Sequence, residues 1–402
     1  MTANPRPASP AVNVQAEAAP FRRDRFTWLA YALLAYFAYL QAAPGLVMPF
    51  IRADMGLSYT IGGLHVSAFA LGMIVAGLTG AALAARLGRR ALFWGGTGGM
   101  AGAALLLAVG RQPAVTIAAT FLMGYLGALL LIMIQAALAD RHGIHRATAL
   151  TESNIFAMLC AGVAPLMLGF FAATVFGWRG ALLVPIVGAA LLAVGNWRVA
   201  IPERQSTGQV KGSGRLPGLF WAYWLVLLSC VAMEWAMVGW GTEFLHAQTG
   251  LAPAAAAAFF GVFFFGGVLG RFANSRWTLH LPAQTLLLLM LIVVAIGFPI
   301  FWLGQNLWLT VAGLAIVGFG VGSLFPLGLG TALNVAAAQS DAASSFVSMG
   351  TGMAMLLAPF TLGWLADAYD LRTAFGAVIV ILAAAIVITV VTNRIATARP
   401  AG

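Results

Sequence analysis

The polar stretch RVAIPERQSTGQVKGSGRLPG, from Arg198 to Gly218, is the only long interruption in an otherwise apolar chain of 402 residues. On each side of it lie enough apolar runs for about six membrane crossings at about 20 residues per crossing. Because 61% of the residues are hydrophobic and only 8% are charged, an ordinary soluble domain is excluded. The sequence therefore predicts an all-α polytopic membrane protein with twelve transmembrane helices in two six-helix repeats.

The two halves are similar to each other. Ala164-Pro165-Leu166-Met167-Leu168-Gly169 corresponds to Ala358-Pro359-Phe360-Thr361-Leu362-Gly363 at an offset of 194 residues (358 minus 164), midway along the expected fifth helix of each half. Such duplication is typical of secondary transporters, whose substrate site lies between the repeats near the middle of the bilayer.

The distribution of basic residues predicts the orientation. If the first crossing starts from the cytoplasm at Phe26, only Arg52, Arg111, Arg179 and Arg372 of the 21 Lys and Arg residues lie outside, which leaves 17 (21 minus 4) inside. This bias places both termini in the cytoplasm and the chain in the inner or plasma membrane, surrounded by lipid. The expected parts are a disordered cytoplasmic tail 1–25, an N-terminal bundle 26–197, a central cytoplasmic loop 198–218, a C-terminal bundle 219–391 and a cytoplasmic tail 392–402.

Several partners and activities are not expected. The net charge of +10 is scattered over segment ends, which argues against nucleic-acid binding. Cys160 and Cys230 fall in separate apolar runs and give neither a disulfide nor a metal-binding pattern. Because the chain has no catalytic or phosphate-binding constellation, we expect no enzyme activity and no cofactor. We expect a monomer.

The segment Gly80-Ala-Ala-Leu-Ala-Ala-Arg86-Leu-Gly88-Arg89-Arg90 forms a short turn between the second and third helices. It resembles the G-x-L-A-D-R-x-G-R-R loop of the major facilitator superfamily, with Ala85 in place of the Asp. The resemblance extends over essentially every segment and implies two six-helix bundles that rock about a central site. It also implies a cytoplasmic gate loop, in which we include Arg86, Gly88, Arg89, Arg90 and Arg146. In the family the Asp helps to hold the two halves together on the cytoplasmic side, so its replacement by Ala85 puts that contact in doubt.

Polar and aromatic side chains in the N-terminal half are candidates for a substrate cavity. Tyr36 and Tyr39 share one face of a first helix expected from Thr27 to Ile51, and Gln41 follows them. These tyrosines either line a cavity or serve helix packing and the membrane interface. Further candidates are Gln135 in the fourth helix and Asn154 in the fifth.

Glu152 lies roughly 9 Å inside the fifth helix at about 1.5 Å per residue and therefore needs a partner. Asn154, Gln135 or Arg146 could supply it. Glu152 either couples transport to protons or forms a structural ion pair with Arg146.

Glu234 lies near the middle of the seventh helix, expected from Leu219 to Leu245, where an unpaired charge costs on the order of 3 kcal/mol or more. We predict that it carries the coupling proton. The segment from Glu234 to Leu245 is similar to the seventh helix of fucose-permease-like members of the superfamily. Trp240, between two glycines, is either a stacking surface in a locally unwound helix or an interface tryptophan.

These observations predict a secondary transporter for a small organic solute by alternating access, most simply a proton symporter. An efflux antiporter for drug-like amphiphiles is the alternative, since Ala161 to Gly169 partly resembles the pattern of the family's drug antiporters. A passive channel or a non-transporting membrane protein is a more distant one. Because few basic residues are expected at mid-depth, we expect a neutral or weakly cationic solute. We expect Glu243, near the outer surface, and Asp367, in an outer turn, to be solvated charges.

Overall fold

A computed structural model describes residues 21–202, 216–336 and 340–398. The tail segment 1–20, the central-loop segment 203–215 and residues 399–402, for which we predicted disorder or a cytoplasmic position, lie outside the described residues. The described chain is helical: α1 Arg25–Leu46, α2 Met48–Met55, α3 Tyr59–Leu87, α4 Arg89–Val109, α5 Pro113–His142, η1 Gly143–His145, α6 Arg146–Ala172, α7 Gly177–Asn196, α8 Gly218–Thr249, α9 Pro253–Trp277, α10 Ala283–Leu303, α11 Leu307–Val335, α12 Ser340–Ala368 and α13 Leu371–Ala398.

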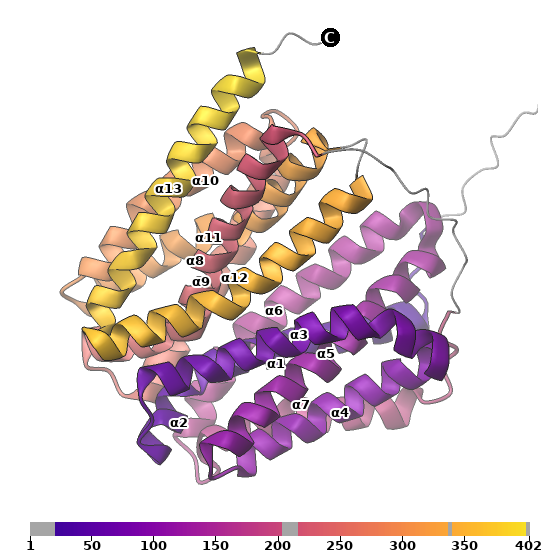
Figure 1. Cartoon of the computed structure of the whole chain (residues 1–402). Helices are drawn as coiled ribbons and strands as arrows, with labels where there is room; N and C mark the ends of the chain where they lie inside the picture. The colour runs from indigo at the N-terminus through magenta and orange to yellow at the C-terminus, as the bar shows by residue number, and fades with distance from the viewer. Residues whose placement is uncertain (1–20, 203–215, 337–339, 399–402) are drawn as a thin grey trace, which may run out of the picture.

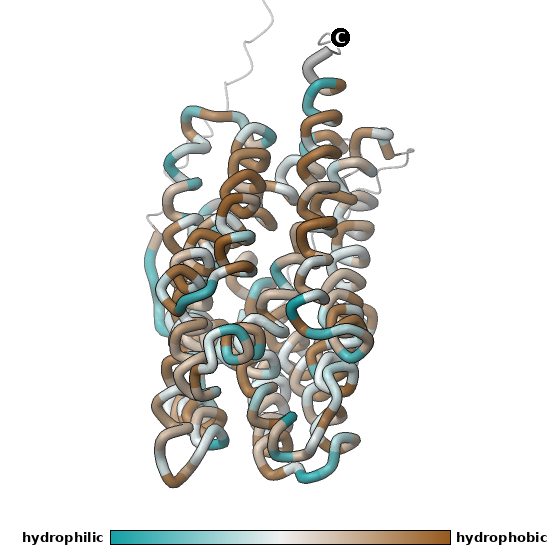
Figure 2. The backbone as a smooth tube through the Cα atoms, turned by 90° about the vertical axis from the view of Figure 1, so that its left-hand side faces the viewer, coloured by the Kyte–Doolittle hydropathy of each residue, from teal (hydrophilic) through white to brown (hydrophobic). Residues whose placement is uncertain are grey.

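Within these residues, 12 helices are long and apolar enough to cross a membrane, which confirms the predicted fold class. Helices α1 to α7 form one half and α8 to α13 the other (Figure 1). We call the side that carries the start of α1, the end of α7 and the start of α8 the terminal side, and the opposite side, which carries α2, the far side. Hydrophobic residues dominate along the helices, and many of the hydrophilic ones lie at the turns (Figure 2).

The duplication is visible in the packing of helices through glycine. A Cβ built on Gly124 of α5 would lie 2.0 Å from the carbonyl oxygen of Phe69 on α3, and one on Gly318 of α11 would lie 2.2 Å from that of Phe263 on α9. Both residues of the second contact follow those of the first by 194 positions (318 minus 124, 263 minus 69). The same close approach of backbones, which only glycine allows, therefore occurs in both halves.

Several segment boundaries differ from the sequence-based ones. The C-terminal bundle does not end at residue 391, because α13 continues to Ala398, within the predicted tail 392–402. The first long helix ends at Leu46, and residues up to Met55 form the separate helix α2, which begins with Pro49 in its first turn. The eighth crossing, α9, which we expect from Ala252 to Phe272 on the sequence, continues to Trp277. At the N-terminus, residues 21–25 were assigned to the disordered tail, but Asp24 accepts a hydrogen bond from the Thr27 amide at 2.9 Å and caps α1.

Candidate functional site

The two halves pack tightly against each other toward the far side. A Cβ on Gly45 of α1 would lie 1.9 Å from the carbonyl oxygen of Val238 on α8, and one on Gly63 of α3 would lie 2.7 Å from that of Pro359 on α12. Ser67 of α3 also donates a hydrogen bond to the Leu356 carbonyl at 2.6 Å. These contacts between backbones leave no room for a solute on the far side.

Ionic contacts between the halves reinforce this closure. Arg52 of α2 forms an ion pair with Glu243 of α8, and their side chains are only 15% and 8% exposed. The Arg52 guanidinium also lies 3.5 Å from the centre of the Tyr59 ring. The carboxylate of Asp367 on α12 accepts hydrogen bonds from the amides of Tyr59 and Thr60 at 2.7 and 2.6 Å, at the positively polarised start of α3.

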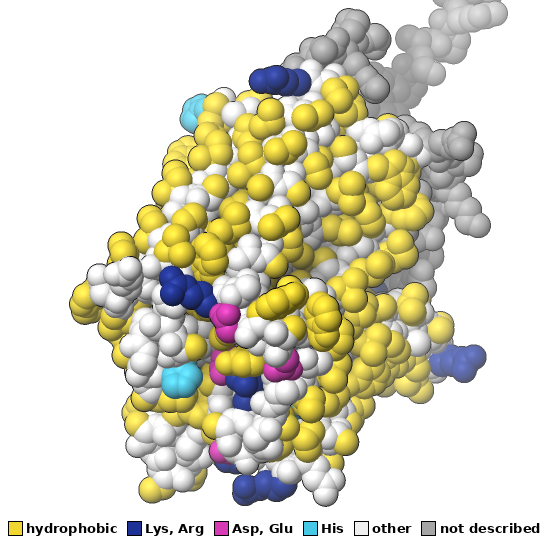
Figure 3. Space-filling view, turned by 60° about the vertical axis from the view of Figure 1, so that its left-hand side comes forward, with side chains coloured by type: hydrophobic (Ala, Val, Ile, Leu, Met, Phe, Trp, Pro, Cys, Tyr) yellow, Lys and Arg dark blue, Asp and Glu magenta, His cyan; other side chains and the backbone are white. Residues whose placement is uncertain are grey.

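The expectation that Glu243 is a solvated charge was therefore wrong, whereas Asp367 is exposed as expected but also binds the start of α3. The sequence could not reveal these contacts, because the partners lie 191 and 308 positions away. Figure 3 shows charged side chains of both signs gathered in a small group among mostly hydrophobic ones.

Toward the terminal side the halves diverge, as the V-shaped arrangement in Figure 1 shows. On α6, Met158, Gly162 and Pro165 form a stripe that contacts α9. Asn154 continues this stripe one turn toward the terminal side, and it is exposed. The helices of the two halves thus pack closely on the far side and diverge toward the terminal side.

Glu234 lies directly beyond the closed contact. It is 16 residues from the start of α8 (234 minus 218) and 15 from its end (249 minus 234), hence at mid-helix. Since α1 and α8 run in the same direction, Gln41 and Glu234 lie one turn before the contacting residues Gly45 and Val238 and face each other across the halves.

The carboxylate of Glu234 is half-buried and makes no hydrogen bond or ion pair within the described residues. Its oxygens are also absent from the buried side-chain atoms that lack a partner, which in the described residues are Trp94 Nε1, Thr242 Oγ1, Glu243 Oε2 and Asn274 Oδ1. Water can therefore reach the carboxylate. A carboxylate that is reachable at mid-depth and not committed to a direct partner can bind a proton or a solute.

Sequence reasoning missed Arg271. It was counted among the 17 basic residues on the cytoplasmic side, as part of a turn after the eighth crossing. However, α9 continues past it to Trp277, and the Nε of Arg271 donates a hydrogen bond to the Gly322 carbonyl of α11 at 2.5 Å. Arg271 and Glu234 interact electrostatically, without forming a direct ion pair. The available signal was the position of Arg271 only one residue past the Gly267-x-x-Gly270 packing motif.

Three predicted cavity residues have other roles in the structure. The hydroxyls of Tyr36 and Tyr39 donate to the carbonyls of Thr97 and Ala181 at 3.1 and 2.8 Å, within the N-terminal half, which favours the packing alternative. Trp240 is fully buried and donates from Nε1 to the Pro359 carbonyl at 2.8 Å. Both alternatives for Trp240 were wrong, because α8 is continuous there and the ring packs in the far-side contact.

Glu152 pairs with a residue that we did not consider. Arg23 donates to both of its oxygens at 2.8 and 2.5 Å, and the Tyr31 hydroxyl donates at 3.0 Å. The predicted partner Arg146 was wrong, since Arg146 is exposed at the start of α6. Asn154 donates to the Leu150 carbonyl of its own helix. Gln135 is exposed on α5.

The arginine turn joins helices of the N-terminal half. Arg89 bonds Asp140 of α5 and the Pro202 carbonyl at 2.8 and 2.6 Å. Arg90 donates to the carbonyls of Trp197 and Val199, just past the end of α7, where a cation is favourable. Arg86 is exposed. Gly88 has φ of 80° and ψ of 154°, a conformation that is essentially restricted to glycine.

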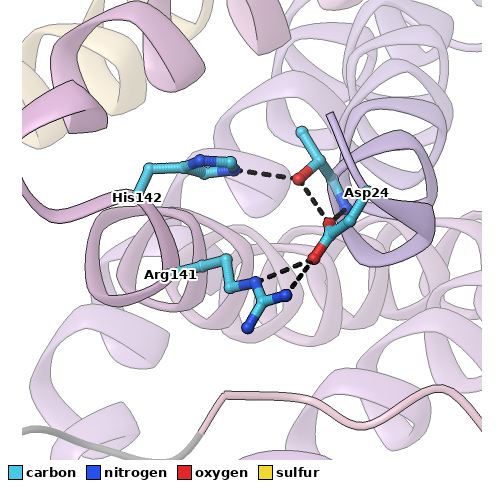
Figure 4. Close-up of polar contacts among 4 residues, drawn as sticks. Asp24, Arg141 and His142 are labelled. Atoms are coloured by element: carbon cyan, nitrogen blue, oxygen red, sulfur yellow. Dashed lines mark hydrogen bonds and ion pairs between the residues drawn. The ribbon is translucent and has the colours of Figure 1, made fainter. Parts of the chain in front are cut away.

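A second polar cluster lies at the terminal end of α1 (Figure 4). Asp24 accepts hydrogen bonds from Thr27 Oγ1 at 2.7 Å and from Arg141 Nε at 2.8 Å, and Thr27 contacts the His142 ring. Burial alone would raise the pKa of Asp24, but the hydrogen bonds from Thr27 and the charge of Arg141 outweigh it and hold the pKa below its usual range. The cluster fixes the start of α1 to the end of α5.

Other proteins resemble this chain. A relative from Yersinia pestis, an uncharacterized MFS-type transporter, is 27% identical over 149 residues, which span 37% of this chain and 39% of that protein. A bacterial homologue of the human lysosomal transporter Spinster, solved in an inward-facing and occupied conformation, has a TM-score of 0.73 at 15% identity and covers 93% of this chain and 98% of its own. The nucleoside transporter NupG has a TM-score of 0.70 at 12% identity, and the match covers 93% of this chain and 98% of NupG. At these identities the two structures show the fold alone.

No group of three or more His, Cys, Asp and Glu in the described residues could hold a metal ion. The Major Facilitator Superfamily matches residues 26–277 and 223–401. Together with the 12 apolar helices and the fold, this match shows that the chain is a multi-pass membrane transporter and belongs to the Major Facilitator Superfamily.

Proposed function

We propose that this chain is a proton-coupled secondary transporter that moves a small organic solute by alternating access. Solute and proton cross the membrane in the same direction, as in symport. The observation that carries the proposal is the carboxylate of Glu234, which is reachable at mid-depth and uncommitted at the point where the halves separate. A charge at such a depth is costly unless it is hydrated or neutralised, so residues of this kind rarely lack a function.

Alternating access supplies the second requirement of coupling. The far-side contacts separate Glu234 from the far-side solution, and the helices of the two halves diverge toward the terminal side. Rocking of the halves about Gln41 and Glu234 would reverse this exposure. Glu234 could then take up a proton on one side and release it on the other.

Glu152 is the weaker candidate for the coupling group. Its carboxylate already pairs with Arg23, which neutralises its charge near the terminal side. We assign it to holding residue 23 and α1 against α6, a structural role that requires no titration.

We further propose that the terminal side faces the cytoplasm in the inner or plasma membrane, as the distribution of basic residues indicates. A cysteine introduced near Gly212 should resist an impermeant maleimide added to intact cells and should react after the cells are opened. Labelling from outside would contradict this orientation.

The transport function is tested with the purified chain in proteoliposomes under an imposed pH gradient, with labelled sugars, organic acids and small amphiphiles. Symport predicts accumulation of a solute above its equilibrium concentration when the proton gradient points in the same direction. Accumulation against the direction of proton flow would instead support the antiport alternative. Flux that only equalises the concentrations would show a passive channel and refute the proposal.

A further inference from the structure

Arg271 changes the expected chemistry of the solute. The expectation of a neutral or weakly cationic solute rested on a lack of basic residues at mid-depth. Arg271 lies near the terminal end of α9, but its side chain donates a hydrogen bond to the carbonyl of Gly322 on α11. Gly322 is 15 residues from the start of α11 (322 minus 307) and 13 from its end (335 minus 322). The guanidinium group therefore lies at mid-depth.

The position of this guanidinium is fixed from two helices. Arg271 donates to the Gly322 carbonyl, and Asn274, on the same face of α9, donates to Ser323 Oγ at 2.9 Å. Nearer the far side, α9 and α11 lie in close contact, since a Cβ on Gly322 would lie 2.4 Å from the Cα of Gly267. A group held in this way is pre-organised for binding and loses little side-chain entropy when a ligand arrives.

Most of the hydrogen-bonding capacity of Arg271 is unused. A guanidinium group has five N–H donors, and within the described residues only Nε has a hydrogen-bond acceptor. Arg271 is half-buried, and neither of its terminal nitrogens is among the buried atoms without a partner, so water reaches them. Two parallel N–H donors at mid-depth match the two oxygens of a carboxylate.

The charges of Glu234 and Arg271 also favour a solute with one carboxylate. Glu234 interacts with Arg271 electrostatically but forms no direct ion pair, so both groups keep room for another partner. As ionised groups, their charges sum to zero. Addition of one carboxylate and one proton leaves the sum at zero, which avoids a net charge at mid-depth during the conformational change.

We propose that the transported solute is an organic monocarboxylate whose carboxyl group binds the terminal nitrogens of Arg271. The inference rests on the proposed transport function and specifies the substrate class for the same site. Arg271 is then a specificity-determining residue, and Glu234 takes up the proton that compensates the charge of the solute.

Binding is tested with the purified full chain in detergent, by following thermal unfolding in the presence of matched acids and amides at constant ionic strength. The probes are lactate and lactamide, nicotinate and nicotinamide, and gluconate and gluconamide. We expect at least one acid to raise the unfolding temperature in a concentration-dependent way and its amide to have no such effect. If no acid stabilises the wild-type protein more than its amide does, the proposal is wrong.

The role of Arg271 is tested with Arg271→Gln, which should weaken binding of that acid by roughly 10–100-fold, in line with the loss of a charge-assisted pair. Arg271→Lys retains the charge without the planar fork and should give an intermediate loss, which separates binding from mere folding. The control is Arg276→Gln, because Arg276 is exposed on the same helix and contacts the Phe272 ring instead. An equal effect of Arg271→Gln and Arg276→Gln would refute the assignment.

Failure of this inference differs from failure of the transport function. If a neutral solute accumulates under a pH gradient and Arg271→Gln does not alter its accumulation, the carboxylate inference fails while transport stands. If acids bind through Arg271 but no solute accumulates, the transport function fails while the inference about binding stands.

Discussion

Substitution of Gly45 by alanine should open the far side. In the structure, a Cβ on Gly45 would lie 1.9 Å from the carbonyl oxygen of Val238 and 3.1 Å from the Cα of Gly239. These are backbone atoms of the opposite half, so no side-chain rotation can relieve the overlap. An ordinary contact begins at 3.4 Å, which requires α1 and α8 to separate by 1.5 Å (3.4 minus 1.9).

The energetic size of this overlap follows from the cost of overpacking, which is about 1–3 kcal/mol in a closely packed region. In the far-side-open conformation the two residues separate, and the cost disappears. The ratio of the far-side-open to the far-side-closed conformation should therefore rise by about 5–150-fold.

The assay is a spin-label distance measurement between two exposed far-side turns, with Gln112 and Gln305 changed to cysteine and the native Cys160 and Cys230 changed to serine. The Gly45→Ala variant should gain a population at longer distance. The control is Gly77→Ala, since a Cβ on Gly77 meets no atom within 4 Å. Identical distance distributions for the two variants would show that the α1–α8 contact does not control closure.

Three further outcomes follow from the described contacts. Glu243→Ala leaves Arg52 buried without its ion partner and should destabilise the protein by about 3–5 kcal/mol in thermal unfolding, with partial recovery on addition of Arg52→Met; no loss would show that the pair is dispensable. Gly88→Val forces a β-branched residue to φ of 80°, so it should impair transport where Ala85→Ser, at an exposed position, does not; equal rates would refute the need for glycine. Because the folded-state pKa of Asp24 is lowered, its contribution to stability is present above the unfolded value of about 3.9 and is lost as the pH falls through the folded value. Asp24→Asn should therefore destabilise the protein near neutral pH and converge with wild type in acid, and a constant difference across this range would contradict the assignment.

The sequence was informative where a local pattern carries the structure. Apolar length predicted the membrane helices, and the repeated Ala-Pro segments placed Pro165 and Pro359 in the fifth crossing of each half, where both lie inside long helices. The depth of Glu234 followed from its position in one apolar run. These properties depend on neighbours along the chain, which a single sequence displays directly.

The sequence was misleading where side chains meet across the fold. Glu243 and Asp367 looked like surface charges because their distance from a loop can be counted, whereas their partners in the other half cannot. Arg271 looked like a turn residue because the segment from Gly270 to Arg276 corresponds to the arginine turn of the N-terminal half, whereas α9 continues to Trp277. Trp240 looked exposed because glycines flank it, but those glycines allow Phe260 and Pro359 to pack close to α8.

The most direct measurement is accumulation driven by a pH gradient in proteoliposomes that contain Glu234→Gln, compared with wild type and with Glu152→Gln. Glutamine keeps the size and hydrogen bonding of Glu234 but removes its titration. We expect Glu234→Gln to abolish accumulation while exchange of labelled for unlabelled solute continues, and we expect Glu152→Gln still to accumulate solute. Wild-type accumulation by Glu234→Gln would refute the role of Glu234 in coupling, since another group would then carry the proton.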